Sequence, residues 1–294
     1  MAWQKHWFQY AVLLFLALIW GSSFILMKVG LRSFNSQQAA SLRIFLASFA
    51  LLPYSIQNLR ALKKKDMKYL ILAGFLGNFI PAYLFMKAET RIDSAIAGML
   101  NSMTPVFTLI IGLIFMGIRT WWAQLVGVFL GFMGALGLIS SGENLALANI
   151  NSYAFLIIIA TTFYGININI VKTHLTHLRG VQITSLSFLF IGPAALLVLL
   201  TTDLSAPLQS QGWIWHFSAL AILGVVGSAF AMLIMNSLIR YTSAVFASSV
   251  TYIIPVFAIM WGLLDGEDIS WMHLIFMATI LAGVYLINRR KITN

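Results

Sequence analysis

The sequence of 294 residues contains no cysteine. Disulfides, thiolate metal sites and cysteine nucleophiles are therefore excluded. Charge is also scarce, because Asp, Glu, Lys and Arg make up 9% of the residues, against about 25% in an average soluble domain. Hydrophobic residues make up 60%. This balance predicts a protein that lies in a lipid bilayer, with no room for a folded soluble domain.

The sequence has only 8 Asp and Glu residues, and none lies in the middle of an apolar stretch. Its 5 histidines also fall near the ends of such stretches. An intramembrane enzyme needs deep titratable groups that act as acid, base or metal ligand, and no such cluster is present. We therefore expect no catalytic residue, no cofactor and no bound metal.

Apolar stretches long enough to cross a bilayer recur along the whole chain. A hydrocarbon core of about 30 Å needs about 20 apolar residues in each helix. Ten transmembrane helices are predicted, at Gln9–Val29, Gln38–Ile56, Met67–Met86, Asp93–Met116, Trp122–Ser140, Tyr153–Lys172, Val181–Thr201, Trp213–Ile239, Ser243–Leu264 and Ser270–Asn288. The fold class is an all-α integral membrane protein.

Basic residues are distributed unevenly between the two sides that these helices define. If the N-terminus is cytoplasmic, most of the 18 Lys and Arg residues fall in cytoplasmic segments. Only Lys28, Arg32, Lys87 and Arg91 fall on the other side. Because positively charged loops stay in the cytoplasm during insertion, both termini are predicted to be cytoplasmic, in the inner membrane of a bacterium. The net charge of +10 then reports orientation and not nucleic-acid binding.

The two halves of the sequence resemble each other. WGSSFILMK, which ends at Lys28, and YGININIVK, which ends at Lys172, lie 144 positions apart. The Pro-Val-Phe motifs that begin at Pro105 and Pro255 lie 150 positions apart. Five is an odd number of crossings, so a second five-helix copy starts on the opposite side of the membrane. We predict two inverted five-helix repeats, residues 1–142 and 149–294, around a central cavity.

WGSSFILMKVGL at 20–31, AASLRIFLASFALLP at 39–53 and the two Pro-Val-Phe motifs resemble the EamA type of the drug/metabolite transporter superfamily. The resemblance implies ten helices, a central substrate cavity and mostly export of small metabolites, with amino acids and their derivatives a common cargo. Small multidrug carriers of that superfamily use a glutamate in the first helix for proton coupling and cation binding. This sequence has none there, which argues against cationic cargo and against carboxylate-based proton coupling.

Polar and aromatic side chains near the middle of the predicted helices form the candidate substrate site. At that depth a polar group needs a protein partner or water. The candidates are Trp20, Arg43, Asn78, Tyr83, Asn101, Tyr164, Asn167, Ser228 and Thr251. Pro105 and Pro255 each free the carbonyl about one turn earlier, at Asn101 and Thr251, and are predicted to form either a gate or a static bend.

Three basic residues within or at the ends of predicted helices leave alternatives open. Arg43 lies about one turn inside the second helix, where it either pairs with Glu89 or Asp93 or meets an anionic group of the substrate. Lys28 and Lys172 end their helices, where snorkelling to the lipid headgroups is the simplest interpretation.

Small residues in the fifth and tenth predicted helices indicate close helix packing. They are Gly127, Gly131 and Gly134 in the fifth helix, and Ala278 and Ala282 in the tenth. Such faces either hold a monomer together or support a homodimer.

Together these patterns predict a secondary transporter that works by alternating access. Its cargo is predicted to be small neutral, zwitterionic or anionic metabolites, with export of amino acids or related solutes favoured. A lipid or nucleotide-sugar carrier of the same fold remains the alternative. A channel would need a continuous pore lined by rings of like residues, which one chain of two inverted units does not readily form. The expected partners are the solute and the bilayer, without nucleic acid.

Overall fold

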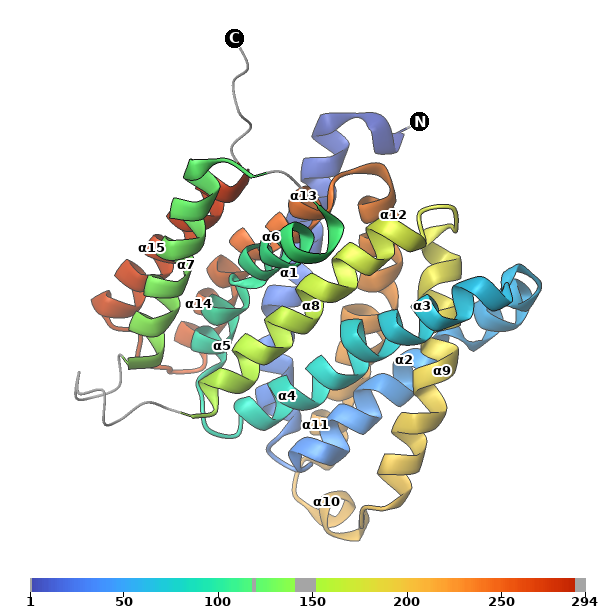
Figure 1. Cartoon of the computed structure of the whole chain (residues 1–294). Helices are drawn as coiled ribbons and strands as arrows, with labels where there is room; N and C mark the ends of the chain where they lie inside the picture. The colour runs from blue at the N-terminus through green and yellow to red at the C-terminus, as the bar shows by residue number, and fades with distance from the viewer. Residues whose placement is uncertain (1, 118–119, 141–151, 289–294) are drawn as a thin grey trace.

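The computed structural model describes residues 2–117, 120–140 and 152–288, and these residues are helical with no strand among them (Figure 1). The first half holds α1 (His6–Gly30), α2 (Ser36–Asn58), α3 (Lys64–Gly74), α4 (Ile80–Ala88), α5 (Ser94–Asn101), α6 (Thr104–Met116) and α7 (Trp122–Ser140). The second half holds α8 (Ala154–His174), α9 (Gly180–Leu200), α10 (Ser205–Gln209), α11 (Trp213–Ile222), α12 (Ala231–Tyr241), α13 (Ala244–Ser248), α14 (Ile254–Leu264) and α15 (Trp271–Asn288). The predicted boundaries at 142 and 149 lie outside the described residues.

Nine stretches of the described helices are long and apolar enough to cross a membrane. Four of these stretches are built from two α-helices each, α3 with α4, α5 with α6, α11 with α12 and α13 with α14. α15 contains a shorter apolar helix, Trp271–Ile287. The helices coincide with the predicted segments to within a few residues, so the chain has the make-up of a multi-pass membrane protein.

π-helical segments separate α3 from α4, at Phe75–Phe79, and α11 from α12, at Leu223–Phe230. A π-helical turn displaces the following side chains from regular α-helical positions and is frequent at functional sites. Two predicted site residues lie in these segments, Asn78 in the first and Ser228 in the second. The same irregularity thus recurs in both halves of the chain.

A second pair of breaks lies just before the two Pro-Val-Phe motifs. α5 ends at Asn101, and α13 is followed by a 3-10 turn, Ser249–Tyr252. Pro105 and Pro255 occupy the first turns of α6 and α14, where a missing N–H leaves no helical hydrogen bond unmade.

The carbonyls near these breaks find donors. The Asn101 carbonyl accepts a hydrogen bond from Thr104 Oγ1 at 2.8 Å. The Thr251 carbonyl accepts one from Ser102 Oγ, also at 2.8 Å. Because Ser102 belongs to the first half and Thr251 to the second, the two broken helices contact each other at their breaks.

α7 and α15 pair through glycines, which lets their backbones approach closely. A Cβ atom added at Gly127 would lie 2.4 Å from the Gly283 carbonyl, and one at Gly283 would lie 2.5 Å from the Gly127 carbonyl. The glycines of the fifth predicted helix therefore form a packing face, as predicted. Ala278 and Ala282 are exposed and do not pack within the chain, while Ile280, Gly283, Val284 and Ile287 of α15 are buried.

Candidate functional site

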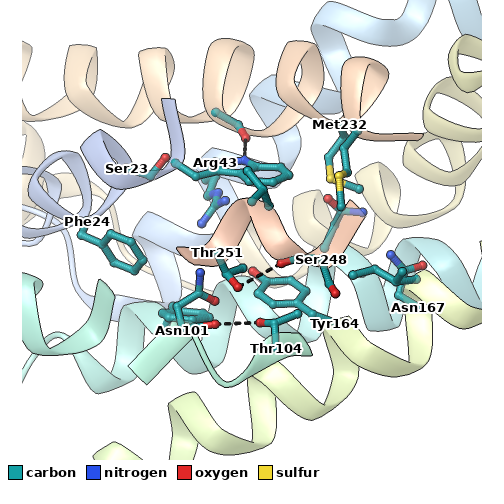
Figure 2. A pocket seen from close by; sticks show the side chains of 18 of the residues that line it. Ser23, Phe24, Arg43, Asn101, Thr104, Tyr164, Asn167, Met232, Ser248 and Thr251 are labelled. Atoms are coloured by element: carbon teal, nitrogen blue, oxygen red, sulfur yellow. Dashed lines mark hydrogen bonds between the residues drawn. The ribbon is translucent and has the colours of Figure 1, made fainter. Parts of the chain in front are cut away.

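A cavity lies between the two halves of the molecule, and its wall comes from both (Figure 2). The space not filled by atoms is about 860 Å³, a volume that includes the opening of the cavity to solvent. Seven predicted site residues line it: Trp20, Arg43, Asn78, Asn101, Tyr164, Asn167 and Thr251.

The chemistry of this wall is mixed. Arg43 is the one charged side chain among the described residues that line the cavity, and neither Asp nor Glu is among them. Amides and hydroxyls supply the remaining polar groups, and apolar side chains supply most of the surface. The cavity therefore carries a net positive charge in a largely apolar surrounding, where charge interactions are stronger than in water.

Arg43 comes from α2, and its guanidinium points into the cavity, on the side where Asn101 and Thr251 lie (Figure 2). Its Nε donates a hydrogen bond to Ser228 Oγ at 2.8 Å, and its Nη1 lies 3.7 Å from the sulfur of Met27. No carboxylate of a described residue lies within ion-pair distance of it. The pair with Glu89 or Asp93, one of the two alternatives for Arg43, is thus not formed, and Arg43 keeps donors available for another group.

Two amide oxygens of the cavity wall also lack partners. Asn101 Oδ1 and Asn167 Oδ1 are buried and have no hydrogen-bond donor among the described residues. Asn167 is held close to the first half by Gly77, where an added Cβ would lie 2.4 Å from Asn167 Nδ2. A buried amide oxygen without a donor costs free energy. These oxygens are therefore ready acceptors for an N–H or O–H group of a ligand.

Two aromatic residues of the matching segments WGSSFILMK and YGININIVK face the cavity. Trp20 Nε1 donates a hydrogen bond to the Gly227 carbonyl at 2.9 Å, which joins α1 to the π-helical segment of the second half. The ring of Tyr164 stacks on Phe85, with centroids 6.0 Å apart. Both rings are thus fixed in place by contacts that cross between the halves.

The other predicted site residues lie behind the cavity wall. Tyr83 Oη lies 2.6 Å from Ser41 Oγ, in a hydrogen bond between α4 and α2. Ser228 Oγ accepts the hydrogen bond from Arg43 Nε and so holds the guanidinium in place. Pro105 and Pro255 start α6 and α14 without lining the cavity. These four residues shape or support the site, and the cavity itself is bounded by others.

Sequence reasoning missed the apolar part of the wall. Phe24, Met27, Phe85, Met232 and Met235 all line the cavity. In a chain that is 60% hydrophobic, an apolar side chain facing a cavity has no sequence feature that separates it from one facing lipid. Only their positions on the same predicted helices as Trp20, Tyr83 and Ser228 pointed toward the site.

Charged residues close one end of the bundle, which we call the Lys28 end. Lys28 Nζ lies 2.7 Å from Glu267 Oε1 and 2.8 Å from Asp265 Oδ2. Arg32 Nη2 lies 3.1 Å from Asp265 Oδ1. The expectation that Lys28 extends to the headgroups was therefore wrong, because α1 is tied to the loop between α14 and α15 instead.

Glu267 also caps the N-terminus of α5. Its carboxylate accepts hydrogen bonds from the Ser94 and Ala95 amides at 3.0 and 2.9 Å, and from Ser94 Oγ at 2.7 Å. Burial raises the pKa of Glu267, but Lys28 and these donors outweigh burial, so its pKa lies below the usual value. For Asp265 the hydrogen bond from Lys28 is the largest influence, and it lowers that pKa as well. Both groups are therefore ionised at neutral pH.

The matching lysine of the second half makes different contacts. Lys172 Nζ donates to the Ile239 carbonyl at 3.1 Å and to the Thr242 carbonyl. No carboxylate of a described residue lies within ion-pair distance of Lys172. Its end of the bundle instead holds the pair His177 Nε2 and Asp66 Oδ2, at 3.0 Å. The two matching lysines thus end in unlike surroundings.

The sequence model of the EamA-like transporter family matches this chain twice, over residues 7–140 and 151–289. The chain belongs to the EamA-like transporter family. This assignment points to a transporter rather than an enzyme. The EamA-type resemblance drawn from the sequence is confirmed.

Relatives of this EamA-like protein extend over nearly its whole length. The uncharacterized inner membrane transporter YedA of Escherichia coli K12 is 26% identical over 96% of this chain and 91% of the relative. A probable terminal-alkyne amino-acid exporter of Streptantibioticus cattleyicolor is 25% identical over 93% of this chain and 91% of the relative. One solved crystal structure matches with a TM-score of 0.67 and 13% identity over 95% of both chains, and thereby shares the fold.

Proposed function

We propose that this EamA-like protein is a secondary transporter of small zwitterionic or anionic solutes, with export of amino acids or related metabolites as its main activity. The observation that carries the proposal is Arg43, a cavity cation without a carboxylate partner among the described residues. A carboxylate of the solute would supply that partner through charge-assisted hydrogen bonds.

The amide oxygens of Asn101 and Asn167 fit the other end of an amino acid. An ammonium group has three N–H donors and no acceptor. Because Asn101 Oδ1 and Asn167 Oδ1 lack donors, a solute that carries a carboxylate and an ammonium group would satisfy both kinds of group in the wall. A cationic solute without a carboxylate would leave Arg43 unpaired and add a like charge to the cavity.

Transport would follow from the architecture of the two halves. We propose ten membrane spans, with residues 1–142 and 149–294 as inverted five-helix repeats and the cavity at their interface. Both termini would be cytoplasmic, in the inner membrane of a bacterium. Inverted repeats give two states of similar energy, one open to each side, which is what a carrier needs. Rocking of the halves around the cavity would be driven by the solute gradient or by a coupled ion.

Solute counterflow in proteoliposomes tests this proposal. Vesicles loaded with an unlabelled solute are diluted into the radiolabelled form, with amino acids, organic acids and nucleosides as the panel. We expect label to accumulate for one or more amino acids and not for the same compounds with the carboxylate converted to an amide. Exchange of nucleosides alone, or movement of a fluorescent lipid probe without exchange of any amino acid, would replace this proposal with the nucleotide-sugar or lipid carrier.

A further inference from the structure

Glu89 is a buried carboxyl group that the cavity does not use. It follows directly after α4, is only 8% exposed, and neither carboxylate oxygen has a hydrogen-bond partner among the described residues. An ionised carboxylate in such a place costs several kcal/mol, whereas the neutral acid costs far less. Burial accordingly raises the pKa of Glu89 well above the usual value, and Glu267 raises it further, while Arg43 and Lys28 act against this.

Charged groups from three other segments act on Glu89. Lys28 on α1, Arg43 on α2 and Glu267 after α14 interact with it electrostatically. On α8, Tyr164 stacks on Phe85, one turn before Glu89. Lys28 is paired with Glu267 and Asp265, and Arg43 donates to Ser228, so neither cation is hydrogen-bonded to Glu89. Glu89 therefore has positive charge nearby but no positive group bound to it.

The second half shows a different arrangement of the corresponding groups. Lys172 matches Lys28 at the offset of 144, and it contacts the carbonyls of Ile239 and Thr242. Ile239 matches Glu89 at the offset of 150. The Lys172 ammonium group thus contacts the main-chain carbonyl of the residue that corresponds to Glu89, whereas Lys28 contacts the two acids after α14.

We propose that Glu89 is a proton-binding site of this transporter, and that Lys28 exchanges between Glu267 and Glu89 as the Lys28 end closes and opens. The inference rests on the alternating access proposed above, in which each half takes the arrangement now seen in the other. If the first half took the arrangement of the second, Lys28 would leave Glu267 and lie at the Glu89 main-chain carbonyl, as Lys172 lies at that of Ile239. The Lys28 ammonium group would then be within reach of the Glu89 carboxyl group.

The exchange has a definite proton balance. With Lys28 on Glu267, the Glu89 carboxyl group keeps its O–H bond. When Lys28 arrives, that O–H bond breaks, the proton passes to water at the opened end, and the carboxylate pairs with the ammonium group. The closed end therefore binds one more proton than the open end. A difference of this kind is what links a proton gradient to the direction of movement.

Electron paramagnetic resonance distances test the link without any solute. Because the chain has no cysteine, spin labels can be placed through Thr90→Cys and Asp268→Cys, two exposed positions at the Lys28 end. In lipid nanodiscs we expect a short distance at mildly acidic pH and a growing population at longer distance as the pH rises. In Glu89→Gln, which cannot ionise, this growth should be lost. Glu89→Asp, which keeps the carboxyl group, should retain it.

Two controls exclude other titrating groups. Asp203→Asn changes an exposed acid at the same end, and His177→Gln removes the histidine paired with Asp66, so both should follow the parent protein. Infrared difference spectra of the unlabelled protein should show a protonated carboxyl band that disappears on raising the pH and is missing in Glu89→Gln. An unchanged distance at every pH, or the same pH response in Glu89→Gln, would overturn the proposal. Failure of amino-acid counterflow would leave these distances untouched, so the two proposals fail separately.

Discussion

Lys28 Nζ lies 2.7 Å from Glu267 Oε1, and this ion pair joins α1 of the first half to the loop between α14 and α15 of the second. The Glu267 side chain is only 2% exposed and also caps α5. One carboxylate therefore fixes three segments at the Lys28 end. The residues that close the bundle there are distinct from those that line its cavity.

Substitution of this carboxylate should loosen the Lys28 end. Glu267→Gln loses the ion pair and the charged cap, so we expect the free energy of unfolding to fall by about 1.5–3 kcal/mol. Arg32→Gln is the matched control, because the Arg32 side chain is 52% exposed and exposed pairs contribute about 0–1 kcal/mol. Denaturant titration in detergent micelles measures both. Equal losses in the two variants would contradict the role given to Glu267.

Arg43 should determine affinity for solutes that carry a carboxylate. Arg43→Gln keeps hydrogen-bonding groups but removes the charge, which is worth about 1.5–3 kcal/mol, or roughly a 10- to 150-fold higher half-saturation concentration in counterflow. Arg43→Lys should lose less, because it keeps the charge while losing the planar donor fork. Unchanged half-saturation in Arg43→Gln would show that the solute carboxylate binds elsewhere.

A cysteine at the cavity wall should be reachable from water. Asn101→Cys places the only thiol of the chain on the cavity, so we expect reaction with a small hydrophilic maleimide and slower reaction with bound solute. Met99→Cys is the control, since Met99 is fully buried and does not line the cavity. Similar labelling rates for the two cysteines would argue against a hydrated cavity at Asn101.

The α7–α15 contact should tolerate no added side chain. Gly283→Val places atoms where the Gly127 carbonyl lies 2.5 Å from a Cβ, so we expect a loss of about 1–3 kcal/mol in the free energy of unfolding. Ala282→Val changes the neighbouring exposed residue and should stay within about 0.5 kcal/mol of the parent. Thermal unfolding followed by tryptophan fluorescence compares them. A milder effect at Gly283 than at Ala282 would mean that the helices separate easily.

Closure of the Lys28 end should be greatest at intermediate pH. The pKa values of Asp265 and Glu267 lie below the usual range in the closed arrangement, so their contribution is present above the usual carboxyl pKa and is lost as the pH falls through the lowered values. Glu89 acts in the opposite sense, because its raised pKa favours closure until the pH rises through it. The spin-label distances should therefore show an acid limb, weakened in Glu267→Gln, and an alkaline limb, lost in Glu89→Gln. A single limb common to all variants would contradict this assignment.

The sequence predicted the helices and much of the cavity wall because both depend on local features. Apolar length fixes where a helix can cross lipid, and a polar group such as Asn101 or Asn167 at depth must face protein or water. Contacts between distant segments were not predictable in the same way. Nothing in the sequence near Lys28 indicates that it meets Glu267, 239 positions away.

The burial of Glu89 is a second feature that the sequence did not predict. It lies just outside the predicted third helix, in a segment expected to be a loop, where a carboxylate is normally hydrated. The structure buries it at the end of α4, which packs against α2 and α8, and this burial depends on how the helices pack. The absence of carboxylates from the middle of the predicted helices therefore does not exclude a proton-binding carboxyl group at the end of one.

The contact between Ser102 and the Thr251 carbonyl bears on how the molecule can change shape. The α5–α6 and α13–α14 spans are already interrupted where they meet, so bending there would break no continuous run of α-helical hydrogen bonds. Elsewhere, bending a continuous helix in lipid would leave amide groups without partners in a medium that offers none. A change of shape at this crossing would therefore leave the hydrogen bonds of uninterrupted helices such as α1 and α8 intact.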